Sequence, residues 1–219
     1  MRARTFTPMV LLLCLLASGC TAAPVAAPPP SPQPTVTVIV TQTPTPVPES
    51  AEEIVLMMEQ LLYTHDGVTD TISFMDGAGV LALFQELTGE LPEGVRGTEW
   101  YSEGYITYDW TEAVSVGMAA DDQTYAWVTV RAPEVGGVPV HTYEGITVGM
   151  TRDEALKTGA REGREAMEGI PATMEVGRQE VPGAKSYDNG GVGILFMSLT
   201  MEGDTIRGMS TSGNDFRDI

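Results

Sequence analysis

The stretch of sequence that says most about the fold is EGITVGMTRDEAL, residues 144–156. Its first part alternates apolar residues with glycine and threonine, which predicts a short strand. Thr151 and Glu154 then have the spacing of a capping box, in which each side chain accepts a hydrogen bond from the other residue's backbone N–H. Asp153 adds negative charge to the first turn, where the helix dipole favours it. The stretch therefore predicts a strand followed by a capped helix.

The same stretch resembles an element of small bacterial envelope lipoproteins, Gly-hydrophobic-x-hydrophobic-Gly-Met-Thr-x-x-Glu-Ala. Some of these lipoproteins have the tandem-repeat fold of the beta-lactamase inhibitor proteins. The resemblance covers residues 144–156 only, and it implies a domain that binds another envelope protein. Gly159 and Gly163 interrupt the helix early, so its length departs from the family pattern.

A similarity within the chain supports repetition. The first series consists of residues 66–68, a predicted strand and a helix that ends at Gly89. The second consists of residues 144–146, a predicted strand and a helix over 151–159. Two α/β units of roughly 80 residues would follow from this similarity. Chance resemblance between two short patterns is the alternative.

Residues 54–63 fit two interpretations. Ser50 and Glu53 have capping-box spacing and apolar residues follow at helical intervals, which predicts a helix. The turn signal at residues 65–67 and the alternating run over 71–75 favour a β-hairpin instead. We expect the hairpin.

Hydrophobic spacing predicts the other elements. An amphipathic helix is expected from Val80 to Leu87, closed by Gly89. Strands are expected over 100–110, 125–130 and 138–143, with a turn over 133–137 between the last two, so that the three form a meander. Strands over 192–201 and 205–212 are expected to form a C-terminal hairpin. Residues 51–219 are therefore expected to form one α+β domain, an antiparallel sheet with two or three short helices on one face, in two similar halves if the repetition is real.

Residues 1–19 have the parts of an export signal: Arg2 and Arg4, an apolar run over 9–17, and small residues before Cys20. The run is too short to span a bilayer as a helix. The order LASGC at residues 16–20 resembles the lipobox of bacterial lipoprotein precursors, which implies cleavage before Cys20 and acylation of that cysteine. An ordinary secretory signal cut elsewhere, with Cys20 left as a free thiol, is the alternative.

Residues 20–50 are predicted to be a lipidated cysteine followed by a spacer. Nine prolines lie between residues 21 and 50, which favours extended polyproline conformation. Removal of residues 1–19 would take away two basic and no acidic residues, so the formal net charge would change from −18 to −20. Such a charge disfavours nucleic acid and anionic lipid as partners.

The run from Trp100 to Trp110 is rich in aromatic residues. Alternation places Trp100, Ile106, Tyr108 and Trp110 on one face, which is expected to be core. Tyr101 and Tyr105 lie on the other face and are the candidate binding residues, as a platform for a sugar or a peptide. Burial of the whole run in the core is the alternative.

No catalytic motif is evident. His65 and His141 are in no metal-binding pattern, no nucleophile elbow or phosphate loop occurs, and no metal or cofactor is expected. Two acidic groups could bind calcium or flank a glycosidic bond, although solvated loops explain them as well. The first is Asp121 with Asp122, and the second is Asp204, Asn214, Asp215 and Asp218.

These observations predict a lipoprotein anchored on the outer, extracytoplasmic side of a bacterial cell membrane, whose domain binds another envelope or secreted protein without catalysis. A cell-wall hydrolase with an acidic pair and a protein inhibitor of a secreted enzyme are the alternatives.

Changing Cys20 to Ala should release the protein from the membrane, because two or three acyl chains anchor a protein firmly and the variant would carry no acyl chain. Fractionation of cells that make each form measures this. Equal retention of the variant and the parent in the membrane fraction would contradict lipidation at Cys20.

Overall fold

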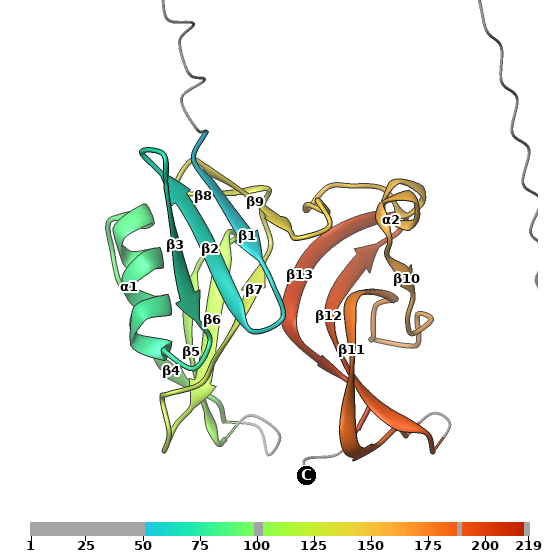
Figure 1. Cartoon of the computed structure of the whole chain (residues 1–219). Helices are drawn as coiled ribbons and strands as arrows, with labels where there is room; N and C mark the ends of the chain where they lie inside the picture. Colours follow the sequence, from blue (N-terminus) through green and yellow to red (C-terminus); the bar gives the residue numbers. More distant parts are fainter. Residues whose placement is uncertain (1–50, 99–102, 188–189, 217–219) are drawn as a thin grey trace, which may run out of the picture. The chain divides into compact units, whose positions relative to one another are not determined.

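The computed structural model describes residues 51–98, 103–187 and 190–216. In this part of the chain two sheets account for most of the regular structure, with two helices, α1 (Gly77–Thr88) and α2 (Arg152–Thr158) (Figure 1). The fold is thus α+β and dominated by antiparallel sheet. The expected export signal, the spacer, Cys20 and Tyr101 lie outside the described residues.

The smaller sheet has five strands in the order β3-β2-β1-β9-β8. All neighbouring strands are antiparallel except β1 and β9, which are parallel. The strands are β1 (Glu53–Leu56), β2 (Gln60–His65), β3 (Val68–Ser73), β8 (Glu134–Val135) and β9 (Val138–Thr142). The expected hairpin is confirmed, with positive φ at Asp66 and Gly67 in its turn. The run over 54–63 is divided into β1 and β2, which also pair with each other.

The larger sheet has eight strands in the order β10-β11-β12-β13-β7-β6-β5-β4, all antiparallel. The strands are β4 (Val95–Arg96), β5 (Tyr105–Trp110), β6 (Val114–Ala119), β7 (Ala126–Val130), β10 (Arg161–Glu162), β11 (Thr173–Lys185), β12 (Val192–Glu202) and β13 (Thr205–Asn214). The C-terminal hairpin is confirmed as β12 and β13. The sequence patterns did not predict β6 or β11.

The expected meander was wrong in its last strand. The chain does return through Gly136 and Gly137, both with positive φ, into β9. However, β9 pairs with β1 of the other sheet, and β6 takes the place beside β7. Val138 and Val140 are buried, so the alternation predicted a strand correctly. Alternation carries no information about which sheet a strand joins.

The strand expected within residues 144–150 is also wrong. These residues form turns, with positive φ at Gly145 and Gly149. Backbone hydrogen bonds fix the segment to the start of β13: Gly149 N–H donates to the Ile206 carbonyl at 2.8 Å, and Ile206 N–H donates to the Met150 carbonyl at 2.9 Å. Ile146 is fully buried, so the apolar pattern reflects an anchored loop.

Both predicted helices are confirmed, although α1 begins earlier than expected, at Gly77. Thr151 and Glu154 form the capping box of α2, and Gly159 ends the helix in the left-handed region. Asp76 accepts a hydrogen bond from Gly79 N–H at the start of α1, and Gly89 ends it. α1 contacts β3, β8 and β6, and α2 contacts β10. No strand precedes α2 as β3 precedes α1, so this part of the internal similarity is not found.

The core lies between the buried faces of these elements. Every second residue of β6 and β7 is buried, as are Met197, Leu199 and Met209 on β12 and β13. Ile54, Leu56 and Leu61 of the smaller sheet and Val80, Leu83 and Phe84 of α1 belong to the same cluster. Among the described residues, no helix has the length and apolar character needed to cross a membrane.

The seam between β7 and β13 joins the two halves of the larger sheet. Its paired residues are Val130 with Met209 and Thr129 with Ser210. Beside them the buried Thr211 hydroxyl accepts a hydrogen bond from Val128 N–H at 3.0 Å. The side chain therefore extends the ladder where backbone pairing stops.

Changing Thr211 to Val should lower the free energy of unfolding by about 1–3 kcal/mol, since a buried N–H loses its acceptor without a change in side-chain shape. Urea denaturation measures this. The same change at the half-buried Thr107 of β5 is the control and should alter stability by less than about 0.5 kcal/mol. Equal effects at both positions would contradict the role of the seam.

Candidate functional site

The outer face of the eight-stranded sheet, opposite the core, is the candidate functional surface. Because side chains alternate along a strand, the residues between the buried ones point outward here. The strand register aligns small hydroxyl side chains across the middle of this face, from β6 through β7 and β13 to β12. They are Ser115, Thr129, Ser210 and Ser198.

Two aromatic rings on this face cover glycines of the neighbouring strand. A β-carbon at Gly117 would lie 2.1 Å from two atoms of the Trp127 indole, so the ring occupies that space. A β-carbon at Gly213 would likewise lie 2.5 Å from the Phe196 ring. The glycines let both rings lie close to the sheet, where they are half-buried.

Tyr105 packs against Trp127 in an edge-to-face arrangement, with ring centroids 5.0 Å apart and planes at 88°. This geometry is favourable for an aromatic pair. Tyr105 stays 43% exposed and Tyr125, just before β7, stays 42% exposed. The three rings therefore form an accessible aromatic corner at one end of the outer face.

Two neighbouring hollows open at this corner. One, of about 500 Å³, is lined by Tyr105, Trp127, Tyr125, Asp122 and Asn214 among others. The next, of about 470 Å³, shares Tyr125 and Asn214 and adds Glu59, Met58 and the exposed Met75. We call the two hollows together the aromatic groove. A third hollow, of about 720 Å³, also includes Asn214 and covers the Phe196 side of the face.

The groove has an acidic character. Thr124 donates two hydrogen bonds to Asp122 Oδ1, from its hydroxyl at 2.7 Å and its backbone N–H at 3.1 Å. These bonds lower the pKa of Asp122, so the carboxylate is ionised at neutral pH. Burial, and then the negative charge of Glu59, raise the pKa of Tyr125 above its ordinary value, so its phenol stays protonated. The groove therefore presents neutral rings beside negative charge.

The structure brings one of the two predicted binding residues into this groove. Tyr105 lines it, whereas Tyr101 lies outside the described residues. The sequence patterns missed Trp127 and Tyr125. Trp127 was detectable as the aromatic residue on the face of the strand opposite Ala126, Val128 and Val130. Its proximity to Tyr105 depends on the pairing of β5, β6 and β7, which no local pattern gives.

The second acidic group considered for catalysis or calcium is dispersed. Asp204 and Asp215 flank the ten residues of β13, so they lie on the order of 30 Å apart at about 3.3 Å per residue. Arg152 pairs with Asp204 at 3.5 Å, and Asp215 accepts a hydrogen bond from Ile194 N–H at 2.6 Å. Both carboxylates therefore have structural contacts. Asp218 lies outside the described residues.

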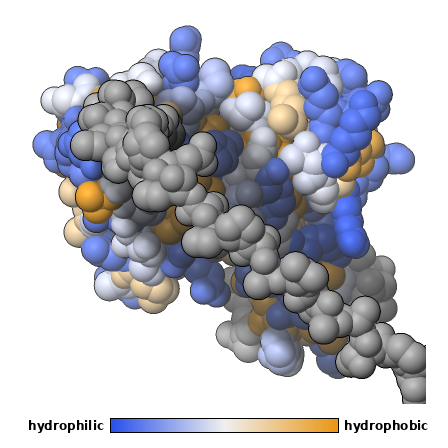
Figure 2. All heavy atoms as spheres, turned by 45° about the horizontal axis from the view of Figure 1, so that its top comes forward, coloured by the Kyte–Doolittle hydropathy of each residue, from blue (hydrophilic) through white to orange (hydrophobic). Residues whose placement is uncertain are grey.

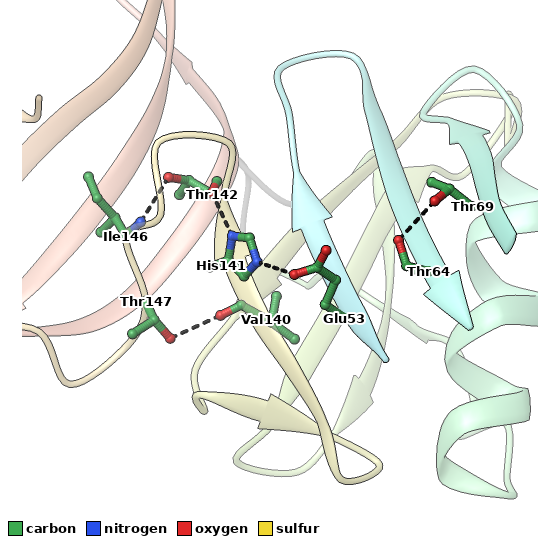
Figure 3. Close-up of polar contacts among 8 residues, drawn as sticks. All are labelled: Glu53, Thr64, Thr69, Val140, His141, Thr142, Ile146 and Thr147. Atoms are coloured by element: carbon green, nitrogen blue, oxygen red, sulfur yellow. Dashed lines mark hydrogen bonds and ion pairs between the residues drawn. The ribbon is translucent and has the colours of Figure 1, made fainter. Parts of the chain in front are cut away.

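The two histidines have local partners in the smaller sheet. His141 on β9 points toward Glu53 on β1, with 3.1 Å between Nε2 and Oε2, and so braces the parallel strand pair (Figure 3). His65 lies 2.9 Å from Asp70 across the β2–β3 hairpin, which raises its pKa. Within residues 51–98, 103–187 and 190–216 no cluster of three or more His, Cys, Asp or Glu could hold a metal ion.

Changing Gly117 to Ala should displace the Trp127 indole, because the new methyl group would overlap it. We expect a changed near-UV circular dichroism signal and a loss of about 1–3 kcal/mol in the free energy of unfolding. Gly104→Ala is the matched control, since a β-carbon there meets nothing within 4 Å. An unchanged aromatic signal in Gly117→Ala would contradict the close packing of the ring.

No family model, no curated protein and no solved structure matches this chain.

Proposed function

We propose that this protein is a membrane-anchored extracytoplasmic lipoprotein whose α+β domain is a non-catalytic binding module for another envelope or secreted protein. The partner would dock on the outer face of the eight-stranded sheet. The observation that carries the proposal is the aromatic corner of Tyr105, Trp127 and Tyr125, held beside the groove on a rigid sheet.

The composition of the face supports protein recognition. Tyr and Trp are enriched among the residues that dominate binding energy at protein interfaces, because they offer large contact areas with few rotatable bonds. The middle of the face carries the small hydroxyl side chains of Ser115, Thr129, Ser210 and Ser198, and charged side chains lie on either side of them. Gly117 and Gly213 let the rings of Trp127 and Phe196 lie close to the backbone of the sheet. Trp127 lines the aromatic groove, and Phe196 lines the third hollow.

The arrangement of elements supports two similar halves. A helix precedes four strands in each half: α1 precedes β4 to β7, and α2 precedes β10 to β13. The sheet order is symmetric about the β7–β13 seam, with β4 and β10 at the two edges. This order fits the resemblance to envelope lipoproteins with a tandem-repeat fold, and each half would contribute one aromatic residue over a glycine.

The polar character of the remaining surface fits a domain that works in an aqueous compartment. Figure 2 shows hydrophilic residues over much of the face that is turned toward the reader, with smaller hydrophobic areas between them. A proline-rich spacer that begins at a lipidated Cys20 would let this domain stand off the membrane. An acidic domain is repelled by anionic lipid, which supports such a spacer.

The test is crosslinking from intact cells with the full chain as bait, followed by comparison of two variants. Tyr105→Ala should reduce the crosslinked partner by about fivefold or more, as loss of an aromatic anchor at the centre of an interface does. Tyr143→Ala is the matched control, because Tyr143 is 71% exposed and follows β9 of the other sheet.

Equal capture by the two variants would contradict docking at the aromatic groove. Release of soluble fragments from purified cell wall by the parent chain would instead support the alternative of a hydrolase.

A further inference from the structure

The lining of the aromatic groove suggests the chemistry of its ligand. Four aromatic residues, two methionines and two carboxylates line the two hollows. Phe74 is fully buried, whereas Tyr105 and Tyr125 are exposed and Trp127 is half-buried. Among the described residues that line the two hollows, none is Lys or Arg. The other hollow on the same face differs, because Arg164 and Arg178 line it. The groove, which continues past Tyr125 and Asn214 to the buried Thr211, is thus a place where negative charge and aromatic rings occur together and no described lining residue is a cation.

The carboxylates are placed to meet a ligand. Both hydrogen bonds from Thr124 end on Oδ1 of Asp122, so Oδ2 is available at the rim of the groove. Glu59 is exposed on the other side of Tyr125, close enough for its charge to act on the phenol. A positive group between them would be attracted from both sides.

The rings and methionines suit a cation on a flexible apolar stem. A guanidinium or ammonium group is attracted to the face of Trp or Tyr within about 6 Å of the ring centroid. The methylene stem of Lys or Arg buries against apolar surface while its head stays near water. Met75, 65% exposed, and Met58 supply such an adaptable surface in the adjoining hollow.

We propose that the aromatic groove receives a lysine or arginine side chain from a basic segment of the partner protein. The inference rests on the proposed binding function and adds the chemistry of the partner. Charge complementarity supports this occupant, because the formal net charge of the chain is −18. Such a charge steers a basic segment toward the domain, and the groove then fixes one side chain of it.

The test uses n-butylguanidinium as a probe and n-butylurea as its neutral isostere. The full chain is labelled with 5-fluorotryptophan in a non-ionic polyoxyethylene detergent, and the ¹⁹F signal of Trp127 is assigned with Trp127→Phe. We expect n-butylguanidinium to shift this signal at concentrations about fivefold or more below those that n-butylurea requires, and added salt to weaken the effect.

The double variant Asp122→Asn and Glu59→Gln should weaken probe binding by about fivefold. Asparagine keeps the acceptor for Thr124, so the turn is preserved. Glu134→Gln, an exposed change on β8 outside the groove, is the control and should bind as the parent does. Equal responses to the two probes, or equal binding by the double variant and the control, would overturn the proposal.

The outcome separates this inference from the proposed function. If Tyr105→Ala loses the crosslinked partner while n-butylguanidinium has no effect on the Trp127 signal, the proposed binding function is supported and the proposal of a basic side chain in the groove is contradicted. If N-acetylglucosamine shifts the Trp127 signal and n-butylguanidinium does not, a glycan replaces the basic side chain as the ligand. If Tyr105→Ala keeps its partner, the proposed function fails whatever the probes do.

Discussion

The hydrogen bonds between β7 and β13 are the interaction on which the larger sheet depends. In the described part of the chain the ladder between these strands has two residue pairs, and it joins four strands that follow α1 to four strands that follow α2. The buried Thr211 hydroxyl adds a bond to Val128 N–H where the ladder ends. A buried N–H without an acceptor costs free energy, so Thr211 favours this pairing of β7 with β13 over other pairings more strongly than an apolar contact would. The outer face is continuous across both halves only because the seam holds.

The candidate site depends on glycines that make room for aromatic rings of the neighbouring strand. Glycine weakens a strand, but it also leaves room above the backbone for a ring from the next strand. Gly117 makes that room for Trp127, and Gly213 makes it for Phe196. Tyr105 then orients the indole from the side. The aromatic corner is therefore fixed by the sheet itself, which gives it the rigidity that a binding surface needs.

Local features were predictable from the sequence, and pairings over long distances were not. The capping box at Thr151, the turn at residues 65–67 and the C-terminal hairpin each depend on a few adjacent residues, and each is found. β9 pairs with β1, which is far away in the chain, and no local pattern shows this pairing. The predicted meander was therefore wrong. The apolar pattern around Ile146 was interpreted as a strand, but it comes from a loop whose anchoring residue is buried. Tyr105 was identified by alternation, whereas its contact with Trp127 required the register of three strands.

The parallel pairing of β1 with β9 has a consequence for the order in which the chain folds. Ile54 pairs with Val140, 86 positions later, so β1 is synthesised long before its neighbour exists. Until then the hairpin of β1 and β2 has an open edge that includes the apolar Ile54 and Leu56. Closing so long a loop is slow, and open edges invite pairing with other chains. The newly made chain is thus most prone to aggregate in the interval before β9 closes that edge.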